Sequence, residues 1–196
     1  KVAVLGAGVM GAQIAAHLVN VRVPVVLFDL PAKEGPKSAI ALKAIANLKK
    51  LKPSPLGVAA EADLIQPANY DEHLEQLRDC DLVIEAIAER MDWKRDLYHK
   101  IAPFVAPHAI LASNTSGLSI TALSEALPEQ LRHRFCGIHF FNPPRYMQLV
   151  ELIPTAATEP QVLDQLETFA TTNLGKGVVR AKDTPNFVAN RVGVAG

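Results

Sequence analysis

The sequence predicts an α/β fold built on a doubly wound, mostly parallel sheet. Short apolar runs alternate along the chain with longer segments whose apolar residues recur at helical spacing. Most of these runs are apolar throughout rather than at every second position, which is typical of strands buried on both faces of a parallel sheet. A glycine-rich turn also separates the first run from the first helical segment. Together these observations favour alternating strands and helices, with helices on both faces of the sheet.

The first 29 residues contain a strand, a helix and a second strand. Residues 1–5 form a short apolar run. Helical spacing follows at Ile14, Ala15, Leu18 and Val19. A second strand is expected at 23–28, with Pro24 near its start, where a proline is tolerated. The segment is therefore a βαβ unit.

The rest of the chain continues the alternation. Further strands are expected at 81–87, 109–113, 135–141, 149–153 and 178–181. Helices are expected at 38–52, 92–101, 119–127 and 161–173. The helix at 119–127 would be capped by Ser119 or Thr121. Residues 59–69 have no clear pattern and are assigned to a connector.

Composition excludes several classes of protein. The chain has 196 residues, 49% of them hydrophobic, which is enough to bury a full core. Twenty basic residues balance twenty acidic ones, so no net charge favours a nucleic acid or a membrane surface as partner. Residues 2–21 carry no charge but are too polar and too rich in glycine for a membrane segment, and they lack the basic region of a signal peptide. We therefore expect a soluble, cytoplasmic protein.

The two cysteines, Cys80 and Cys136, lie far apart and fit no metal-binding spacing. They are interpreted as small buried hydrophobic residues in a reducing compartment. We expect no metal site.

The turn from Gly6 to Gly11 has the pattern G-x-G-x-x-G. Gly6 allows a tight turn, Gly8 lets the backbone approach a pyrophosphate, and Gly11 lets the helix pack on the strand. Asp29 ends the second strand, where a carboxylate can bind a ribose 2′-hydroxyl. This is the Rossmann-type dinucleotide fingerprint. Leu30 follows Asp29 instead of an arginine, which favours NAD over NADP, although Lys33 leaves this preference open. A flavin would use the same turn, but a flavin enzyme needs no base placed like His139, and the sequence has no obvious second nucleotide-binding segment.

His139 and Glu151 are the candidate proton-transfer pair. His139 stands near the end of one apolar run and Glu151 lies within the next. If these runs are neighbouring strands that reverse near Arg145, the two side chains face each other as a base and its orienting carboxylate. The carboxylate would then raise the pKa of the histidine. A core histidine and a strand-edge glutamate explain these two residues equally well when they are taken alone.

Other polar residues also follow predicted strands. They are Glu89, the run Ser113 to Ser116, and Asn142. Each has a structural explanation as a cap or turn residue, but all would lie with His139 at the edge of the sheet where ligands bind. Lys94 begins a helix nearby and fits a site residue and a solvated surface lysine equally well.

Several longer motifs occur together in this chain. They are Gly6-x-Gly8-x-Met10-Gly11, Glu85-Ala86-Ile87-Ala88-Glu89, Ser113-Asn114-Thr115-Ser116, His139-Phe140-Phe141-Asn142-Pro143 and Lys182-Asp183-Thr184-Pro185-Asn186-Phe187-x-x-Asn190-Arg191. In this order they resemble the (S)-3-hydroxyacyl-CoA dehydrogenase family of fatty-acid β-oxidation. The resemblance covers nearly the whole chain, and the motifs at 139–143 (His-Phe-Phe-Asn-Pro) and 183–187 (Asp-Thr-Pro-x-Phe) are far more specific than the glycine turn.

The resemblance implies NAD-dependent oxidation of a 3-hydroxyacyl-CoA to a 3-oxoacyl-CoA. His139 would be the general base and Glu151 its partner. Ser116 and Asn190 would hydrogen-bond the substrate oxygen or the acyl group. The implied cofactor contacts are Gly6, Gly8, Met10, Gly11, Asp29, Ala88, Glu89, Lys94, Ser116 and Asn142.

The resemblance also implies a domain division and partners. Residues 1–184 would form the NAD-binding domain, and 185–196 would begin a truncated helical C-terminal domain that completes the substrate site and forms a homodimer. A fused enoyl-CoA hydratase domain is a further expected partner. The family's helical arm is shortened here to about 31–66, and its lysines (Lys43, Lys49, Lys50 and Lys52) fit a solvated face better than a CoA site. We expect the isolated chain to bind NAD but to turn over acyl-CoA poorly.

Two alternatives remain open on the sequence. One is a dehydrogenase of a small hydroxy acid or sugar acid on the same framework. The other is a non-catalytic NAD-binding protein, against which the presence of Ser116, His139, Glu151 and Asn190 together argues, since a scaffold needs none of them.

Overall fold

The computed structural model describes residues 1–183. Asn190 and the expected start of a helical domain at 185–196 lie outside these residues. The strands are β1 (Val2–Leu5), β2 (Val25–Asp29), β3 (Ile65–Asn69), β4 (Leu82–Glu85), β5 (Ile110–Ser113), β6 (Phe135–Phe140), β7 (Leu149–Ile153) and β8 (Gly177–Arg180). The α-helices are α1 (Val9–Asn20), α2 (Ala39–Leu48), α3 (Met91–Ile101), α4 (Ile120–Glu125) and α5 (Pro160–Thr168).

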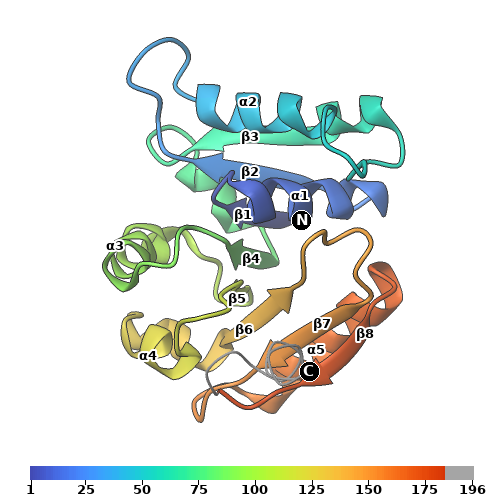
Figure 1. The fold of residues 1–196 in the computed structure, drawn as a ribbon. Helices are drawn as coiled ribbons and strands as arrows, with labels where there is room; N and C mark the ends of the chain where they lie inside the picture. The colour runs from blue at the N-terminus through green and yellow to red at the C-terminus, as the bar shows by residue number, and fades with distance from the viewer. Residues whose placement is uncertain (184–196) are drawn as a thin grey trace.

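Within the described residues the strands form one eight-stranded sheet in the order β3-β2-β1-β4-β5-β6-β7-β8 (Figure 1). Neighbouring strands pair in parallel from β3 to β6, and β7 runs antiparallel to β6. β8 is again parallel to β7. The predicted doubly wound, mostly parallel sheet is confirmed. The strand order reverses direction between β1 and β4, where ligands bind in sheets of this type.

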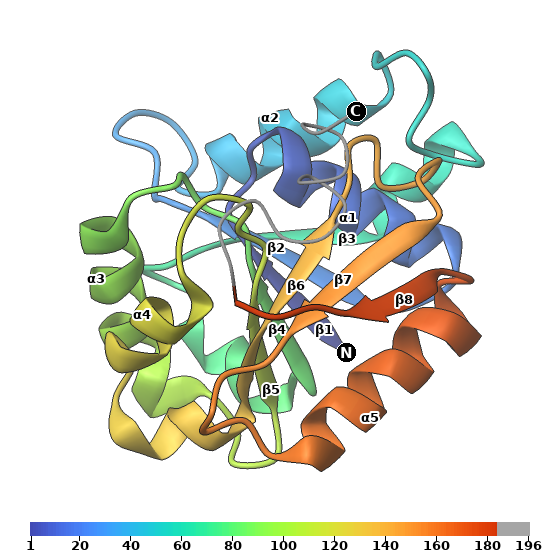
Figure 2. The ribbon, with the colours of Figure 1, turned by 60° about the horizontal axis from the view of Figure 1, so that its bottom comes forward.

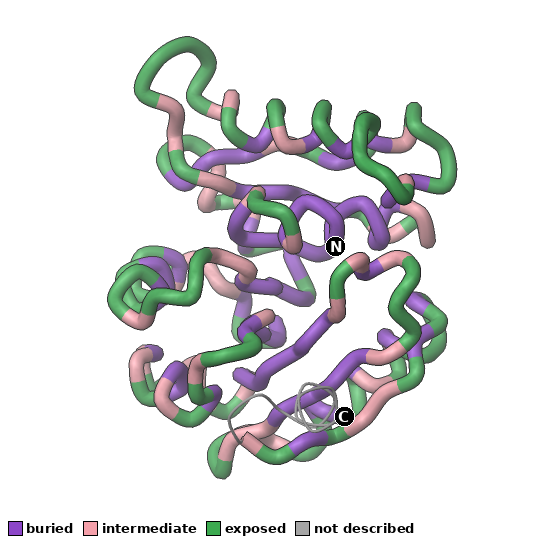
Figure 3. Tube along the Cα trace, viewed as in Figure 1, coloured by how far each residue is buried: buried purple, intermediate pink, exposed green. Residues whose placement is uncertain are grey.

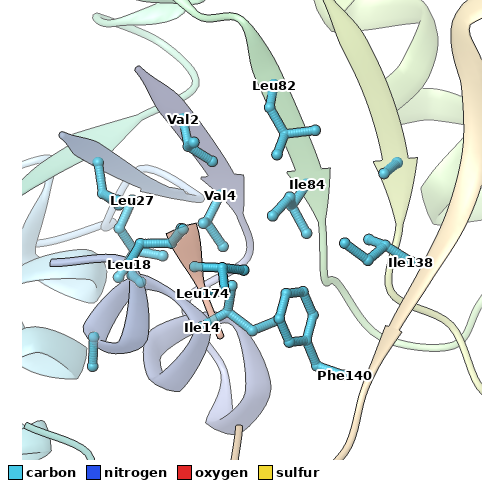
Figure 4. Close-up of a cluster of buried hydrophobic side chains, with 14 of the residues drawn as sticks. Val2, Val4, Ile14, Leu18, Leu27, Leu82, Ile84, Ile138, Phe140 and Leu174 are labelled. Carbon is cyan, nitrogen blue, oxygen red and sulfur yellow. The ribbon is translucent and has the colours of Figure 1, made fainter. Parts of the chain in front are cut away.

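Helices cover both faces of the sheet, as the two turned views show (Figures 1 and 2). Helices α1, α2 and α5 pack on one face, and α3 and α4 pack on the other. The strands supply both cores by alternation, since Val2 and Val4 of β1 join the first cluster whereas Ala3 and Leu5 join the second. Figure 4 shows the first cluster, in which side chains of β1 and β4 meet those of α1. The continuously apolar strands are explained by this two-sided burial.

Burial follows the same layering. The central strands appear as nearly continuous buried segments, and exposed residues gather on the connecting loops and on α2 (Figure 3). Within the described residues, every helix falls short of the length and apolar character that crossing a bilayer requires. Cys80 and Cys136 are buried free thiols, in agreement with their interpretation as core residues.

Residues 59–69 differ from the sequence prediction. They contain a 3₁₀ turn (Ala59–Leu64) and then β3, whereas we expected a connector. Pro67 interrupts the strand pattern, and β3 lies at the edge of the sheet, where β2 is its one partner among the strands that the structure describes. An edge strand tolerates proline because only one side of its backbone takes part in the ladder.

The later helices also differ in detail. The helix predicted at 161–173 ends as an α-helix at Thr168 and continues as a π-helical turn (Phe169–Asn173).

Helix α4 is capped by Ser119, whose Oγ accepts a hydrogen bond from the Ala122 N–H at 3.2 Å. Asp183 adds a second cap that the sequence did not predict. Its carboxylate accepts hydrogen bonds from the N–H groups of Ile120 and Thr121 at 2.9 and 2.8 Å.

Candidate active site

Two cavities lie at the carboxyl ends of the strands. The first has a volume of about 540 Å³ and includes Asp29 and Trp93 in its wall. The second has a volume of about 600 Å³ and includes His139. Gly8 and the run Ala86 to Ala88 line both, so the two cavities adjoin over the glycine turn. Two adjoining cavities of this size can together hold a ligand that has two halves.

The glycines of the turn meet different surroundings. Gly6 has φ +106°, and a Cβ there would lie 2.8 Å from the Ala86 carbonyl oxygen. A Cβ at Gly11 would overlap the Gly6 carbonyl oxygen. A Cβ at Gly8 would meet nothing within 4 Å. The protein therefore requires Gly6 and Gly11 for its own packing, whereas Gly8 leaves an open cradle at the start of α1 that fits a pyrophosphate.

Asp29 is held in a defined orientation at the end of β2. Its Oδ2 accepts a hydrogen bond from the Ala7 N–H at 2.7 Å, and its Oδ1 accepts one from the Leu30 N–H at 2.6 Å. The carboxylate therefore joins the glycine turn to the strand end and also lines the first cavity. This is the position that a ribose-binding carboxylate requires.

His139 and Glu151 face each other across β6 and β7, as the sequence predicts. They are direct partners in the antiparallel register, and His139 Nδ1 lies 3.5 Å from Glu151 Oε1. The side chain of Glu151 is fully buried, and that of His139 is 8% exposed. A buried carboxylate beside one ring nitrogen fixes the orientation of the imidazole.

The pKa of His139 differs from our expectation. Burial lowers it below the ordinary histidine value, and the carboxylates of Glu151 and Glu89 act in the opposite direction without overcoming burial. The expected upward effect of Glu151 is present, but the expected net increase is wrong. The consequence is that His139 is neutral near pH 7 and able to accept a proton.

Most of the predicted site residues converge on the second cavity. Its wall contains His139 together with Gly8, Met10, Ala88, Glu89, Ser116 and Asn142. Gly6 and Asp29 line the first cavity. Gly11 packs against the turn and lies in neither of these walls.

Lys94 is entirely buried and lines neither of these two cavities. Its interpretation as a solvated surface lysine is therefore wrong. Its Nζ lies 2.5 Å from Glu85 Oε2 and 3.7 Å from Glu89 Oε1.

Sequence reasoning did not place Glu85 beside the site, and it placed Asn114 there only as a member of the run Ser113 to Ser116. Glu85 ends β4 and is fully buried. Asn114 lines the second cavity, and its Oδ1 accepts a hydrogen bond from the Phe140 N–H at 2.9 Å, next to His139. Both residues lie at or just after the end of an apolar strand. That position was the available signal, which we followed at Glu89 and at the run Ser113 to Ser116 but not at Glu85.

Comparison with known proteins gives the family. A family model described as 3-hydroxyacyl-CoA dehydrogenase, NAD binding domain, matches residues 1–184. The chain belongs to this family. The family model describes an NAD-binding domain, and the open cradle at Gly8 and the oriented Asp29 carboxylate fit that cofactor.

Individual relatives agree with this membership of the 3-hydroxyacyl-CoA dehydrogenase family. The chain is 45% identical over 197 residues to a Deinococcus radiodurans protein provisionally named 3-hydroxyacyl-CoA dehydrogenase, covering 100% of the chain and 57% of the relative. It is 46% identical over 194 residues to a Rickettsia felis protein provisionally named fatty acid oxidation complex trifunctional enzyme, covering 98% of the chain and 27% of the relative. The crystal structure of 3-hydroxybutyryl-CoA dehydrogenase from Escherichia coli K12 matches with a TM-score of 0.80 and 33% identity, covering 98% of this chain and 40% of that one. The NAD-binding domain described here thus spans about half or less of these relatives.

Proposed function

We propose that the protein oxidises (S)-3-hydroxyacyl-CoA to 3-oxoacyl-CoA with NAD. The observation that carries this proposal is the buried His139–Glu151 pair on the wall of a cavity that continues into the glycine cradle. The names of the relatives support the substrate class.

In this reaction His139 takes the proton of the substrate 3-hydroxyl group. Since Nδ1 faces Glu151, the other ring nitrogen, Nε2, would accept it. The lowered pKa keeps the imidazole neutral before reaction, and the Glu151 carboxylate stabilises the imidazolium that forms. NAD, when bound, accepts the hydride that leaves C3 of the substrate.

The surrounding residues would position the reactants. Gly8 and Asp29 would hold the pyrophosphate and the ribose, and Met10, Ala88, Glu89 and Asn142 would surround the nicotinamide half. Ser116 and Asn190 would hydrogen-bond the substrate oxygen. Ser116 is exposed on the wall of the second cavity, and this position supports its proposed hydrogen bond to the substrate. Lys94 remains a proposed cofactor residue, acting through Glu89.

The domain division and the partners also belong to this proposal. Residues 1–184 would bind NAD, and a helical domain beginning at 185–196 would complete the substrate site and form a homodimer. The trifunctional name and the low coverage of the Rickettsia felis relative support fusion to further domains, including an enoyl-CoA hydratase. The buried free thiols support a reducing compartment such as the cytoplasm.

The decisive experiment is an assay of NADH formation by the full-length protein with 3-hydroxyacyl-CoAs of several chain lengths. His139→Gln should lower kcat by about 10²–10⁴, because general-base catalysis contributes that much. His108→Gln is the control, since His108 is 63% exposed and lies before β5, away from both cavities.

Three results would contradict the proposal. Retention of activity within a few fold by His139→Gln would exclude its role as base. Oxidation of free hydroxy acids in preference to their CoA thioesters would identify a dehydrogenase of small acids. NAD binding without turnover of any of these substrates would favour a non-catalytic protein.

A further inference from the structure

We propose that Glu85 is a positioning residue of the NAD site, which orients the wall shared by the two cavities without touching the ligand. The binding part of this inference rests on NAD binding by the domain, and only its kinetic part rests on the proposed function. Glu85 is the last residue of β4 and is completely buried.

The carboxylate of Glu85 is saturated with hydrogen bonds. Oε1 accepts from Tyr98 Oη and Ser113 Oγ, each at 2.7 Å. Oε2 accepts from Lys94 Nζ at 2.5 Å and from the Ile87 N–H at 2.9 Å. These donors come from α3, from β5 and from the loop after β4, so one side chain joins three parts of the structure.

The loop that Glu85 holds is the wall between the two cavities. Ala86, Ile87 and Ala88 line both of them. Glu85 fixes this loop directly through the Ile87 N–H, and Lys94 approaches the Ile87 carbonyl oxygen at 3.4 Å. A shift of this backbone would therefore change both halves of the NAD site at once.

The network continues to the second cavity through Lys94. Its ammonium group lies 3.7 Å from Glu89 Oε1. The other oxygen of Glu89 accepts hydrogen bonds from Thr115 Oγ1 at 2.5 Å and from the Gly117 N–H at 3.2 Å. Glu85 therefore orients Lys94, Lys94 orients Glu89, and Glu89 holds the loop on which Ser116 lies.

Stability alone does not explain a buried ion pair here. Both side chains of the Glu85–Lys94 pair have no exposed surface. Replacing such a pair by apolar residues is often neutral or stabilising, whereas removing one partner leaves an uncompensated charge. The pair is better explained by its directed contacts with the shared wall and with Glu89.

The test distinguishes an effect of Glu85 on the position of the cavity wall from an effect on the stability of the fold. Glu85→Gln removes the charge and should raise the NAD dissociation constant about tenfold, the loss expected for one charge-assisted hydrogen bond. The double variant Glu85→Gln/Lys94→Met removes both charges. It should recover the melting temperature of the wild type but not its NAD affinity. Glu75→Gln makes the same chemical change at an exposed ion pair with Arg78 and should leave affinity unchanged.

The chain carries its own reporter for these measurements. Trp93 is its one tryptophan, and it lines the first cavity. Quenching of its fluorescence by NAD, or energy transfer from it to NADH, gives the dissociation constant for the 196-residue chain without any turnover. In the full-length protein, Glu85→Gln should raise the KM for NAD more than it lowers kcat.

The proposal is wrong if the double variant regains affinity together with stability, because Glu85 would then be only structural. It is also wrong if a folded Glu85→Gln binds NAD within twofold of the wild type. Absence of a Trp93 signal in the wild type would instead contradict the NAD site. Full turnover by His139→Gln would contradict the proposed reaction while leaving the binding result intact.

Discussion

Gly8 and Gly11 belong to the same turn, but their replacement should have opposite consequences. Gly8 has extended backbone angles, φ −77° and ψ −167°, which alanine adopts readily, and open space surrounds it. Gly8→Ala should therefore fold normally and bind NAD at least tenfold more weakly, since the added methyl group occupies the pyrophosphate cradle. Titration of Trp93 fluorescence measures the affinity, and the melting temperature reports folding.

Gly11→Ala is the matched comparison. Its added methyl group would overlap the Gly6 carbonyl oxygen, so α1 could not pack on the glycine turn as it does. The expected result is a lower melting temperature. Equal melting temperatures of the Gly11→Ala variant and the wild type would show that this packing is not required.

Asp29 should control the choice between NAD and NADP. Asp29→Asn keeps one acceptor oxygen but loses the negative charge, and charge-assisted hydrogen bonds contribute about 1.5–3 kcal/mol. The KM for NAD should rise roughly 10- to 100-fold. The KM for NADP should fall, because the repulsion between the carboxylate and a 2′-phosphate is removed. Initial rates with both cofactors measure this switch, and an unchanged ratio of the two KM values would show that Asp29 does not read the ribose.

At the residue scale, the sequence predicted the positions of the candidate site residues better than it predicted their burial and their pKa values. Asp29, His139 and Glu151 occupy the expected places because strand ends and register can be read from apolar runs. The burial of Lys94 and the lowered pKa of His139 could not be read in this way. Both depend on how the elements pack together in the folded chain.

At the element scale, helix α4 depends on a residue far from it in the sequence. Asp183 accepts hydrogen bonds from two of its first N–H groups and from Ser119 Oγ at 2.9 Å. Asp183→Ala should lower the free energy of unfolding by about 0.5–2 kcal/mol, as the loss of a helix cap does. Urea denaturation measures this change. Glu159→Ala, at the start of α5 where no side-chain cap is formed, is the control and should have a smaller effect.

The elements that the sequence predicted poorly are those whose residue pattern depends on the elements packed against them in the fold. The central strands β1, β4 and β5 are apolar except for Glu85 and Ser113 at the ends of β4 and β5, because helices cover both their faces. β3 contains Pro67 and polar residues, and it forms a strand only because β2 offers it a free edge. Local sequence does not contain that information.

At the scale of the whole molecule, His17 should make stability depend on pH. It lies in α1 and is 7% exposed. Burial lowers its pKa from 6.5 to about 4, and the positive charge of Lys176 contributes in the same direction. The unfolded chain therefore binds a proton at His17 between pH 6.5 and about 4 that the folded protein does not bind.

Stability should accordingly be complete above pH 6.5 and fall as the pH decreases toward 4. The lowered pKa of His139 acts in the same direction. The contribution of His17 is on the order of 3 kcal/mol. His17→Gln should reduce this loss when urea denaturation is compared at pH 6.5 and 4.5, whereas His108→Gln should not. An equal loss in wild type and His17→Gln would exclude His17 as its source.

By itself, the sequence determined the class of fold, the glycine cradle, the carboxylate at the end of β2 and the pairing of His139 with Glu151. These features depend on local pattern and on strand register, which short stretches of sequence encode. Only the tertiary structure decided that β3 is a strand, that burial outweighs Glu151 in setting the pKa of His139, and that Glu85 and Lys94 form a buried network beside the two cavities. Desolvation and hydrogen bonding between distant segments produce these features, so they exist only once the chain has folded.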